Sequence, residues 1–474
     1  MVDRLGSNAL LNMLGDWRAD GYGALHSQLA VAVARSVESG VLAAGTVLPS
    51  ERTLARSLDV SRSTVTAALN ELRSAGVLES RQGSGTRVAG GPQGRGVAER
   101  PGATVLPGLL GPRGVDDQID LAASTPDDAG ALPRIDIDAD ALLDAGSGHG
   151  YTPAGLPALR DAVAQRLTLG GLPTVAEEVL ITNGAQHGLA LALDRVAPAG
   201  GRVIVDEPTY PGVIDLLRSR SVRGLPLART AGGIDATGLR RLVRAQGTTA
   251  AYLQTSVHNP TGWAAQDWQF RELAKACDDL GLTVIEDLVL ADLRYDGSLP
   301  APIAARTRKA TVIVIGSISK LGWGGLRIGW LRGPADVVER LVRTRLADDL
   351  GSSVPSQLIA AGVLEHFDDV AGIRQRTLGE RAELARTLIA DRLPTWRPAV
   401  PAGGLSLWIQ LPEPLAEPLA QRARRHGVLV ATGVSASIEG RFDDHVRICF
   451  DRAPDRLEAG IDRLAAAWDE LVGA

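Results

Sequence analysis

The hydrophobic pattern of the first 90 residues predicts three short helices followed by a hairpin. Apolar residues recur at helical spacing over residues 23–39. A second helical pattern ends at about Ser57, and Ser61 is a candidate N-cap for a third helix over residues 62–75. Residues 77–88 form two strand-like stretches around a glycine-rich turn, which predicts a β-hairpin.

Three helices with a hairpin wing suit DNA binding. In such units the third helix enters the major groove by its N-terminal residues, where hydroxyls and arginines reach phosphates and base edges. The candidate DNA-binding residues lie at the starts of the second and third helices and in the hairpin: Arg52, Ser61, Arg62, Ser63, Thr64, Arg81, Gln82 and Gly83. The pattern alone also fits a small helical domain whose hairpin binds nothing.

Three linked motifs decide between these interpretations. They are Leu-Pro-Ser-Glu-Arg-Thr-Leu-Ala at 48–55, Val-Ser-Arg-Ser-Thr-Val at 60–65 and Glu-Ser-Arg-Gln-Gly-Ser-Gly-Thr at 79–86. In this order they resemble the winged helix of GntR-type bacterial regulators. The resemblance implies a DNA-binding domain over residues 23–90, preceded by an N-terminal extension of residues 1–22, and it favours DNA binding over a merely solvated charged surface.

The rest of the chain predicts a linker and an α/β domain. Residues 91–118 are rich in glycine and proline and lack a sustained apolar period, which is typical of a linker. Over residues 119–474, apolar runs alternate with amphipathic helices, which predicts a mainly parallel sheet with helices on both faces. We assign residues 335–474, approximately, to a smaller α+β portion of this domain. The clearest strand-like runs are at 179–182, 202–205, 250–253, 283–285 and 311–315.

Composition then narrows the class of protein. The chain has 474 residues, of which 45% are hydrophobic and 22% charged, so we expect a globular protein of two or three domains. Acidic residues near the N-terminus oppose a signal peptide and no long apolar window occurs, so we expect a cytoplasmic location. Two cysteines are too few for a thiolate metal site, and no metal is implied. The net charge of −5 means that DNA binding must be local.

Lysine is rare in this chain. Among 50 cationic residues, the lysines are Lys275, Lys309 and Lys320. Arginine stays protonated and cannot supply a neutral amine, so imine chemistry has three candidate positions. Lys275 and Lys309 lie in ordinary surface segments, whereas Lys320 follows the strand-like run 311–316 at the edge of the sheet where ligands bind.

Other motifs indicate what Lys320 would react with. Residues 183–186 (Asn-Gly-Ala-Gln) begin a helix after a strand, as phosphate-binding turns do, and Asp287 ends a strand and could face a pyridinium nitrogen. Alone, the turn also fits a plain helix cap, and Asp287 a solvated strand end. Together with residues 259–262 (Asn-Pro-Thr-Gly), Lys320 and Arg327, in this order and spacing, the motifs resemble fold type I, aspartate-aminotransferase-like enzymes that use pyridoxal 5'-phosphate (PLP).

This resemblance implies a role for each matching residue. Lys320 would form the internal aldimine, Asp287 would hold the pyridinium nitrogen, and Asn259 would hydrogen-bond the phenolic oxygen of PLP. The phosphate would be held by Ala185, Gln186, Ser317, Ser319 and Arg327, with Tyr151 reaching it across a homodimer interface. Tyr210 would stack on the pyridine ring, although it also fits an ordinary core aromatic.

The resemblance extends to the effector side of the site, with one departure. Arg447 matches the arginine that clamps a substrate carboxylate, which implies an amino-acid-like ligand. His258 is a candidate pocket residue, and a structural histidine is an equal alternative. The family often has a tyrosine two residues after the pyridinium aspartate, where this chain has Val289, so transaminase turnover is in doubt.

A GntR-type winged helix, a linker and an aminotransferase-like domain in one chain resemble the MocR subfamily of bacterial transcription regulators. The resemblance implies a regulator that binds a double-stranded DNA operator, uses PLP as cofactor, and responds to PLP itself or to an amino-acid-like or amine effector. It also implies a head-to-tail homodimer. The alternatives are a PLP-dependent aminotransferase with an accessory DNA-binding domain, and a scaffold that binds DNA without PLP.

Overall fold

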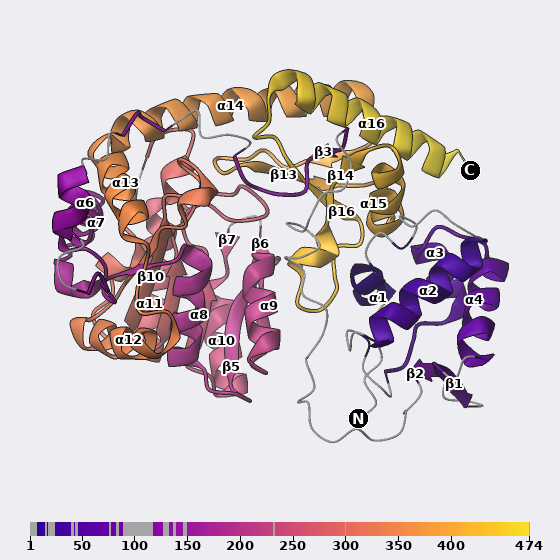
Figure 1. The fold of residues 1–474 in the computed structure, drawn as a ribbon, viewed down its shortest axis with the longest axis horizontal. Helices are drawn as coiled ribbons and strands as arrows, with labels where there is room; N and C mark the ends of the chain where they lie inside the picture. Colours follow the sequence, from indigo (N-terminus) through magenta and orange to yellow (C-terminus); the bar gives the residue numbers. More distant parts are fainter. Residues whose placement is uncertain are drawn as a thin grey trace.

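The chain forms an N-terminal winged helix beside a larger domain of two lobes (Figure 1). The structure is a computed structural model. It describes residues 7–14, 17, 24–38, 42, 46–74, 77–81, 85–88, 117–126, 132–135, 139–145, 149–230, 233–298 and 300–473. Among the helices of these residues, none is both long and apolar enough to cross a bilayer.

The winged helix has the three helices and the hairpin that the sequence predicts. Its elements are α1 (Ser7–Leu14), α2 (Leu25–Glu38), α3 (Glu51–Ser57), α4 (Arg62–Ser74), β1 (Leu78–Arg81) and β2 (Gly85–Val88). Two hydroxyl caps define the helix-turn-helix: Ser50 Oγ accepts from the Thr53 amide at 3.2 Å, and Ser61 Oγ accepts from the Thr64 amide at 3.1 Å. The predicted N-cap at Ser61 is therefore confirmed.

Helix α1 lies within residues 1–22, where the hydrophobic pattern predicts no element. Leu10, Leu11 and Leu14 are buried in the same core as Leu54 of α3 and Val65 of α4. The helix is short, and its apolar face gains a partner only when the winged helix folds. Helix α1 is thus part of the DNA-binding unit.

We expect Leu10→Ala to destabilise the winged helix by about 2–5 kcal/mol, because it removes a buried leucine and leaves a cavity. Hydrogen exchange of the α2 and α4 amides should therefore accelerate. Val31→Ala is the matched control, since Val31 is half-exposed on α2. Unchanged exchange in the Leu10 variant would show that α1 does not contribute to the core.

The large lobe is built on an eight-stranded mixed sheet in the order β4-β11-β10-β9-β8-β5-β6-β7. Neighbours from β10 through β6 run parallel, whereas β11 and β7 are antiparallel to their neighbours. The strands are β4 (Val179–Thr182), β5 (Arg202–Glu207), β6 (Arg223–Thr230), β7 (Gly233–Ile234), β8 (Ala250–Leu253), β9 (Thr283–Asp287), β10 (Thr311–Ser317) and β11 (Gly329–Arg332). The predicted mainly parallel sheet is confirmed.

Helices cover both faces of this sheet, as expected for strands buried on both sides. Val203 and Val205 of β5 pack on the face covered by α8 (Ala185–Val196), α9 (Pro211–Ser219) and α12 (Ala335–Asp348). Ile204 points to the other face, covered by α10 (Ala236–Gln246) and α11 (Asp267–Leu280). At one edge lie α6 (Ala139–Ala145), α7 (Pro157–Leu169) and α13 (Val354–Glu365).

The small lobe is a four-stranded sheet covered by three helices. The sheet order is β12 (Arg397–Pro398), β13 (Ser406–Gln410), β16 (His445–Cys449) and β15 (Ala431–Thr432). Its helices are α14 (Phe367–Arg392), α15 (Ala416–Arg425) and α16 (Pro454–Val472). The lobe boundary differs from the expected residue 335. Helices α12 and α13 pack on the large lobe, whereas β3 (Ile119–Asp120) pairs with β14 (Val428–Leu429) in the small lobe.

The winged helix contacts the small lobe through α3 and α15 (Figure 1). Asp59, in the turn between α3 and α4, has an Oδ2 atom 2.8 Å from Arg425 Nη2 and 3.1 Å from Arg422 Nε. Arg422 also donates to the backbone oxygen of Glu470 in α16 at 2.7 Å. Burial alone would raise the pKa of Asp59, but the hydrogen bonds from the two arginines lower it. We call this set of ion pairs the Asp59 clasp.

Candidate functional site

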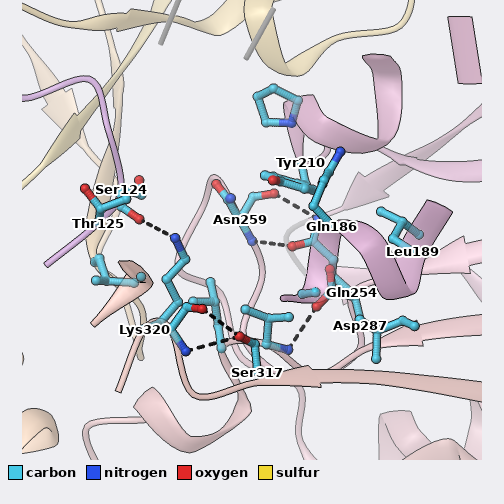
Figure 2. Close-up of a pocket in the computed structure, with 18 of the residues that line it drawn as sticks. Ser124, Thr125, Gln186, Leu189, Tyr210, Gln254, Asn259, Asp287, Ser317 and Lys320 are labelled. Carbon is cyan, nitrogen blue, oxygen red and sulfur yellow. Dashed lines mark hydrogen bonds between the residues drawn. The ribbon is translucent and has the colours of Figure 1, made fainter. Parts of the chain in front are cut away.

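A cavity of about 490 Å³ lies between the two lobes of the large domain (Figure 2). The carboxyl ends of β9 and β10 and the N-terminus of α8 form one side of it, and β13 and β16 contribute residues from the small lobe. Ten of the residues singled out from the sequence line it: Ala185, Gln186, Tyr210, Asn259, Asp287, Ser317, Ser319, Lys320, Arg327 and Arg447. Open α/β sheets bind ligands at this edge.

One end of the cavity is suited to a phosphate. Helix α8 begins at Ala185, so the unpaired amides of its first turn and the positive end of its dipole favour an anion there. Ser317 Oγ and Ser319 Oγ lie 2.9 Å apart beside it, and Arg327 Nη2 donates to the Asn183 carbonyl at 2.8 Å. A Cβ atom at residue 184 would lie 2.7 Å from Arg327 Nη2, so glycine is needed for the arginine to approach the helix start.

Lys320 follows β10, and its Nζ atom donates to the Ser124 carbonyl at 2.9 Å (Figure 2). Burial lowers the pKa of this amine to about 8, because removal from water disfavours the charged form. At pH 7 about one amine in ten is therefore uncharged, far more than for an ordinary lysine. An uncharged amine is the form that attacks an aldehyde.

We expect the rate at which Lys320 condenses with an aldehyde to rise with pH and to reach half its maximum near pH 8. The sign follows because the reactive neutral amine predominates above its pKa. Stopped-flow absorbance after adding PLP to the cofactor-free protein measures this rate. A midpoint near the ordinary lysine pKa of about 10.4 would contradict the effect of burial.

Asp287 and Tyr210 form the middle of the cavity. Asp287 Oδ1 accepts from the Val289 amide at 2.9 Å, and Oδ2 accepts from Tyr252 Oη at 2.5 Å. Burial raises the pKa of Asp287, and the two hydrogen bonds oppose that rise. Burial also raises the pKa of Tyr210, which is therefore a neutral phenol. Val289 lines the cavity with an apolar side chain.

Arg447 of β16 supplies a cation from the small lobe. Its Nη2 atom donates to the Ala122 carbonyl at 2.6 Å, and Nη1 donates to Asn259 Oδ1 at 3.2 Å. Arg447 Nε, Gln186 Oε1 and Ser124 Oγ are buried and have no hydrogen-bond partner within the described part of the chain. Buried polar atoms are normally paired, so these three fit a polar ligand that completes their hydrogen bonding. The anion-binding end, the amine and the carboxylate fit PLP in particular.

Two predicted residues lie away from the cavity lining. Tyr151 is 57% exposed on the surface. His258 is buried, with Nδ1 2.8 Å from Thr261 Oγ1 and Nε2 3.0 Å from the Pro208 carbonyl. Burial lowers the pKa of His258 well below its usual value, so the ring is neutral and both nitrogens are engaged. This environment matches the structural alternative for His258.

The structure places residues 123–125 in the cavity lining, which the sequence did not indicate. Ala123, Ser124 and Thr125 line the cavity, although they follow the linker and belong to no motif. Arg452 holds this segment, donating to the carbonyls of Ala123 at 2.7 Å and Thr125 at 2.8 Å. The pairing of β3 with β14 and the hydrogen bonds from Arg452 bring the segment to the site, and because both join distant parts of the chain, no local signal could have revealed it.

The predicted DNA-binding residues whose side chains the structure describes lie at the starts of α3 and α4. Arg52, Ser61, Arg62 and Ser63 are exposed, and Thr64 is half-buried beneath them. Arg62 Nε lies 3.8 Å from Glu51 Oε2, which leaves its guanidinium largely in solvent. Arg81 ends β1, and its side chain, like Gln82 and Gly83, lies outside the described residues.

Comparisons with known proteins match both parts of the chain. The family described as aminotransferase class I and II matches residues 116–464, and the bacterial regulatory proteins of the gntR family match residues 25–88. The chain is 29% identical to the uncharacterized HTH-type transcriptional regulator YisV of Bacillus subtilis, over 94% of this chain and 96% of that protein. It is 28% identical to a 2-aminoadipate transaminase of Thermus thermophilus, over 68% of this chain and 81% of that protein.

Among solved structures, the chain is similar to the α-aminoadipate aminotransferase LysN of Thermus thermophilus, complexed with N-(5'-phosphopyridoxyl)-L-leucine. The TM-score is 0.71 and the identity 24%, over 79% of this chain and 97% of that one. This likeness supports the two-lobed fold of the large domain.

Proposed function

Because the chain belongs to the aminotransferase class I and II family and carries a GntR-type helix-turn-helix domain ahead of it, as MocR-type regulators do, we propose that it is a transcription regulator controlled by PLP chemistry. The main observation behind this proposal is that one chain contains both a ligand cavity and a DNA-binding domain. A cavity with a reactive lysine and an anion-binding end is connected to a winged helix in which Ser61, Arg62 and Ser63, at the start of α4, face solvent.

Some residues of the cavity bind the cofactor, and others bind the effector. Ala185, Ser317 and Arg327, which line one end of the cavity, would hold the phosphate, and Asp287 would pair with the pyridinium nitrogen. When bound, PLP supplies an aldehyde that bonds to Lys320 Nζ and to amines that compete with it. Arg447 pairs with a carboxylate, so the effector is an amino-acid-like compound or, when no amine is present, PLP itself.

The protein acts in the cytoplasm as a head-to-tail homodimer on a double-stranded operator. Tyr151, which is exposed, would reach the phosphate of the partner's cofactor in this arrangement. Two winged helices then contact two half-sites, and their spacing follows from the symmetry of the dimer. Light scattering of the purified protein tests the oligomeric state.

The Asp59 clasp links the two sites, because α15 connects the small lobe to the turn of the helix-turn-helix. We expect Asp59→Asn to loosen this contact by about 1 kcal/mol, since it removes a charge from a half-buried ion pair. Hydrogen exchange of the α3 amides should then rise about fivefold, while PLP affinity stays the same. Asp117→Asn is the control, because Asp117 pairs with Arg463 away from the winged helix. Equal exchange in both variants would show that the clasp does not restrain the domain.

Fluorescence anisotropy tests the regulator function. The purified protein is titrated onto DNA from upstream of its own gene and onto a scrambled duplex, at a stated salt concentration because phosphate contacts are salt-dependent. We expect specific binding, at least about 10³-fold tighter than to the scrambled duplex. Equal affinity for the two duplexes would reject autoregulation through that DNA.

A PLP-dependent aminotransferase with an accessory DNA-binding domain is the second candidate function. The presence of Lys320 and Arg447 in one cavity favours it. The apolar Val289 opposes it, because the phenol donor that often tunes the cofactor's phenolic oxygen is missing. Sustained turnover of an amino donor with a keto acid would establish this function.

A further inference from the structure

Tyr252 is a buried tyrosine to which neither the motifs nor the proposed function assign a role. It lies in the middle of β8, is fully buried, and pairs in register with Ile285 of β9. Its hydroxyl crosses to the end of β9 and donates to Asp287 Oδ2 at 2.5 Å. Because Tyr252 is absent from the cavity lining, it reaches the site only through Asp287.

We infer that Tyr252 is a positioning residue, whose hydroxyl holds the Asp287 carboxylate in the ionised form and orientation that pair with the pyridinium nitrogen of PLP. The inference rests on the proposed PLP site. It assigns Asp287 two fixed donors, the Tyr252 hydroxyl on Oδ2 and the Val289 amide on Oδ1.

The geometry leaves room for the cofactor. An ionised carboxylate offers about four lone-pair sites, and these two donors occupy two of them. Donors on both oxygens fix the rotation of the carboxyl group, so a free lone pair can stay directed at the cavity. A carboxylate held before the ligand arrives loses less entropy on binding.

The charge environment explains why such a donor is needed. Burial raises the pKa of Asp287, and the neighbouring Asp206 raises it further. The hydrogen bonds from Tyr252 and Val289 and the cation of Lys320 lower it. Tyr252 does not lose its own proton, because burial and the adjacent carboxylate raise its pKa well above 10. Its hydroxyl is therefore a permanent donor to Asp287.

The test compares Tyr252→Phe with Tyr295→Phe. Tyr295 is the matched control, because its side chain is partly buried and its hydroxyl donates to the Gly404 carbonyl at 3.0 Å and not to Asp287. PLP affinity is measured by absorbance titration across pH. We expect Tyr252→Phe to raise the dissociation constant about tenfold, as loss of a hydrogen bond to a charged group does, and Tyr295→Phe to leave it unchanged.

The pH profile separates a positioning role from a packing role. Without the Tyr252 donor, the pKa of the Asp287 carboxyl rises. As the pH is lowered, the variant should therefore begin to lose PLP affinity at a higher pH than the wild type does. In the Asp287→Asn background the same substitution should have no further effect, because its target is already gone. A packing defect would persist in that background and leave the midpoint of the pH profile in place.

The outcomes separate this inference from the function on which it rests. A wild-type protein that binds no PLP would overturn the proposed function. A wild type that binds PLP, with both tyrosine variants matching it in affinity and pH profile, would overturn the role of Tyr252 alone. A Tyr252→Phe effect of equal size in the Asp287→Asn background would also overturn it.

Discussion

Lys320→Ala should abolish covalent attachment of PLP and, with it, every response of DNA binding to the cofactor. Lys320 is the one lysine that lines the described cavity, and burial lowers the pKa of its amine to about 8, so no other side chain there can take over its reaction. The substitution removes a single hydrogen bond, from Nζ to the Ser124 carbonyl. The fold should therefore persist.

Borohydride reduction followed by mass spectrometry measures this result directly. The wild type should carry one PLP group fixed to the peptide that contains Lys320, and the variant should carry none. Lys275→Ala is the matched control, because Lys275 is exposed and pairs with Asp279 at 2.9 Å on α11. If the Lys320 variant responds normally to the effector in a reporter assay, the cavity is not the sensor.

Arg62→Ala should weaken operator binding by about 5- to 150-fold, the range for loss of one good contact to a base edge. Arg62 is the first residue of α4, and its side chain is 72% exposed, so it can extend into the major groove. The Ser61 cap beneath it is independent of the arginine side chain. The weaker binding of the Arg62→Ala protein should therefore come from a lost DNA contact and not from misfolding.

Anisotropy titrations at several salt concentrations show which contact is lost. If Arg62 reads a base, discrimination between the operator and a scrambled duplex falls. If it binds a phosphate, affinity falls equally for both duplexes and the salt slope decreases by about one. Arg271→Ala removes the same charge from an exposed site on α11 and serves as the control. Equal binding by the wild type and the Arg62 variant would contradict the predicted recognition surface.

Local signals explain which parts of the fold could be predicted from the sequence. Strands such as β4 and β8 have the predicted bounds, because buried parallel strands are continuous apolar runs. The predicted cap at Ser61 depends only on residues within one turn, since its hydroxyl accepts from the Thr64 amide. Helix α1 was not predicted, because eight residues are too few to show a clear helical period of apolar positions. Tertiary packing stabilises so short a helix.

The residues of the candidate site also differ in whether a local sequence signal reveals them. Lys320, Asp287 and Asn259 lie in motifs next to strands, and the structure places all three around one cavity. Ser124 and Tyr252 carry no such signal, because their positions depend on strand pairing between distant segments. His258 was a candidate pocket residue with a structural histidine as the alternative, and both of its ring nitrogens have partners within the protein.

The central claim is that PLP at Lys320 and DNA at the winged helix are coupled, and one linked titration tests it. Operator affinity is measured by anisotropy with the cofactor-free and the PLP-loaded protein, and PLP affinity is then measured with and without operator. We predict that each ligand changes the affinity of the other by the same factor, about 5- to 150-fold, because coupling between two sites is reciprocal. Identical operator affinities in the two states would show that the sites are independent and would contradict the account.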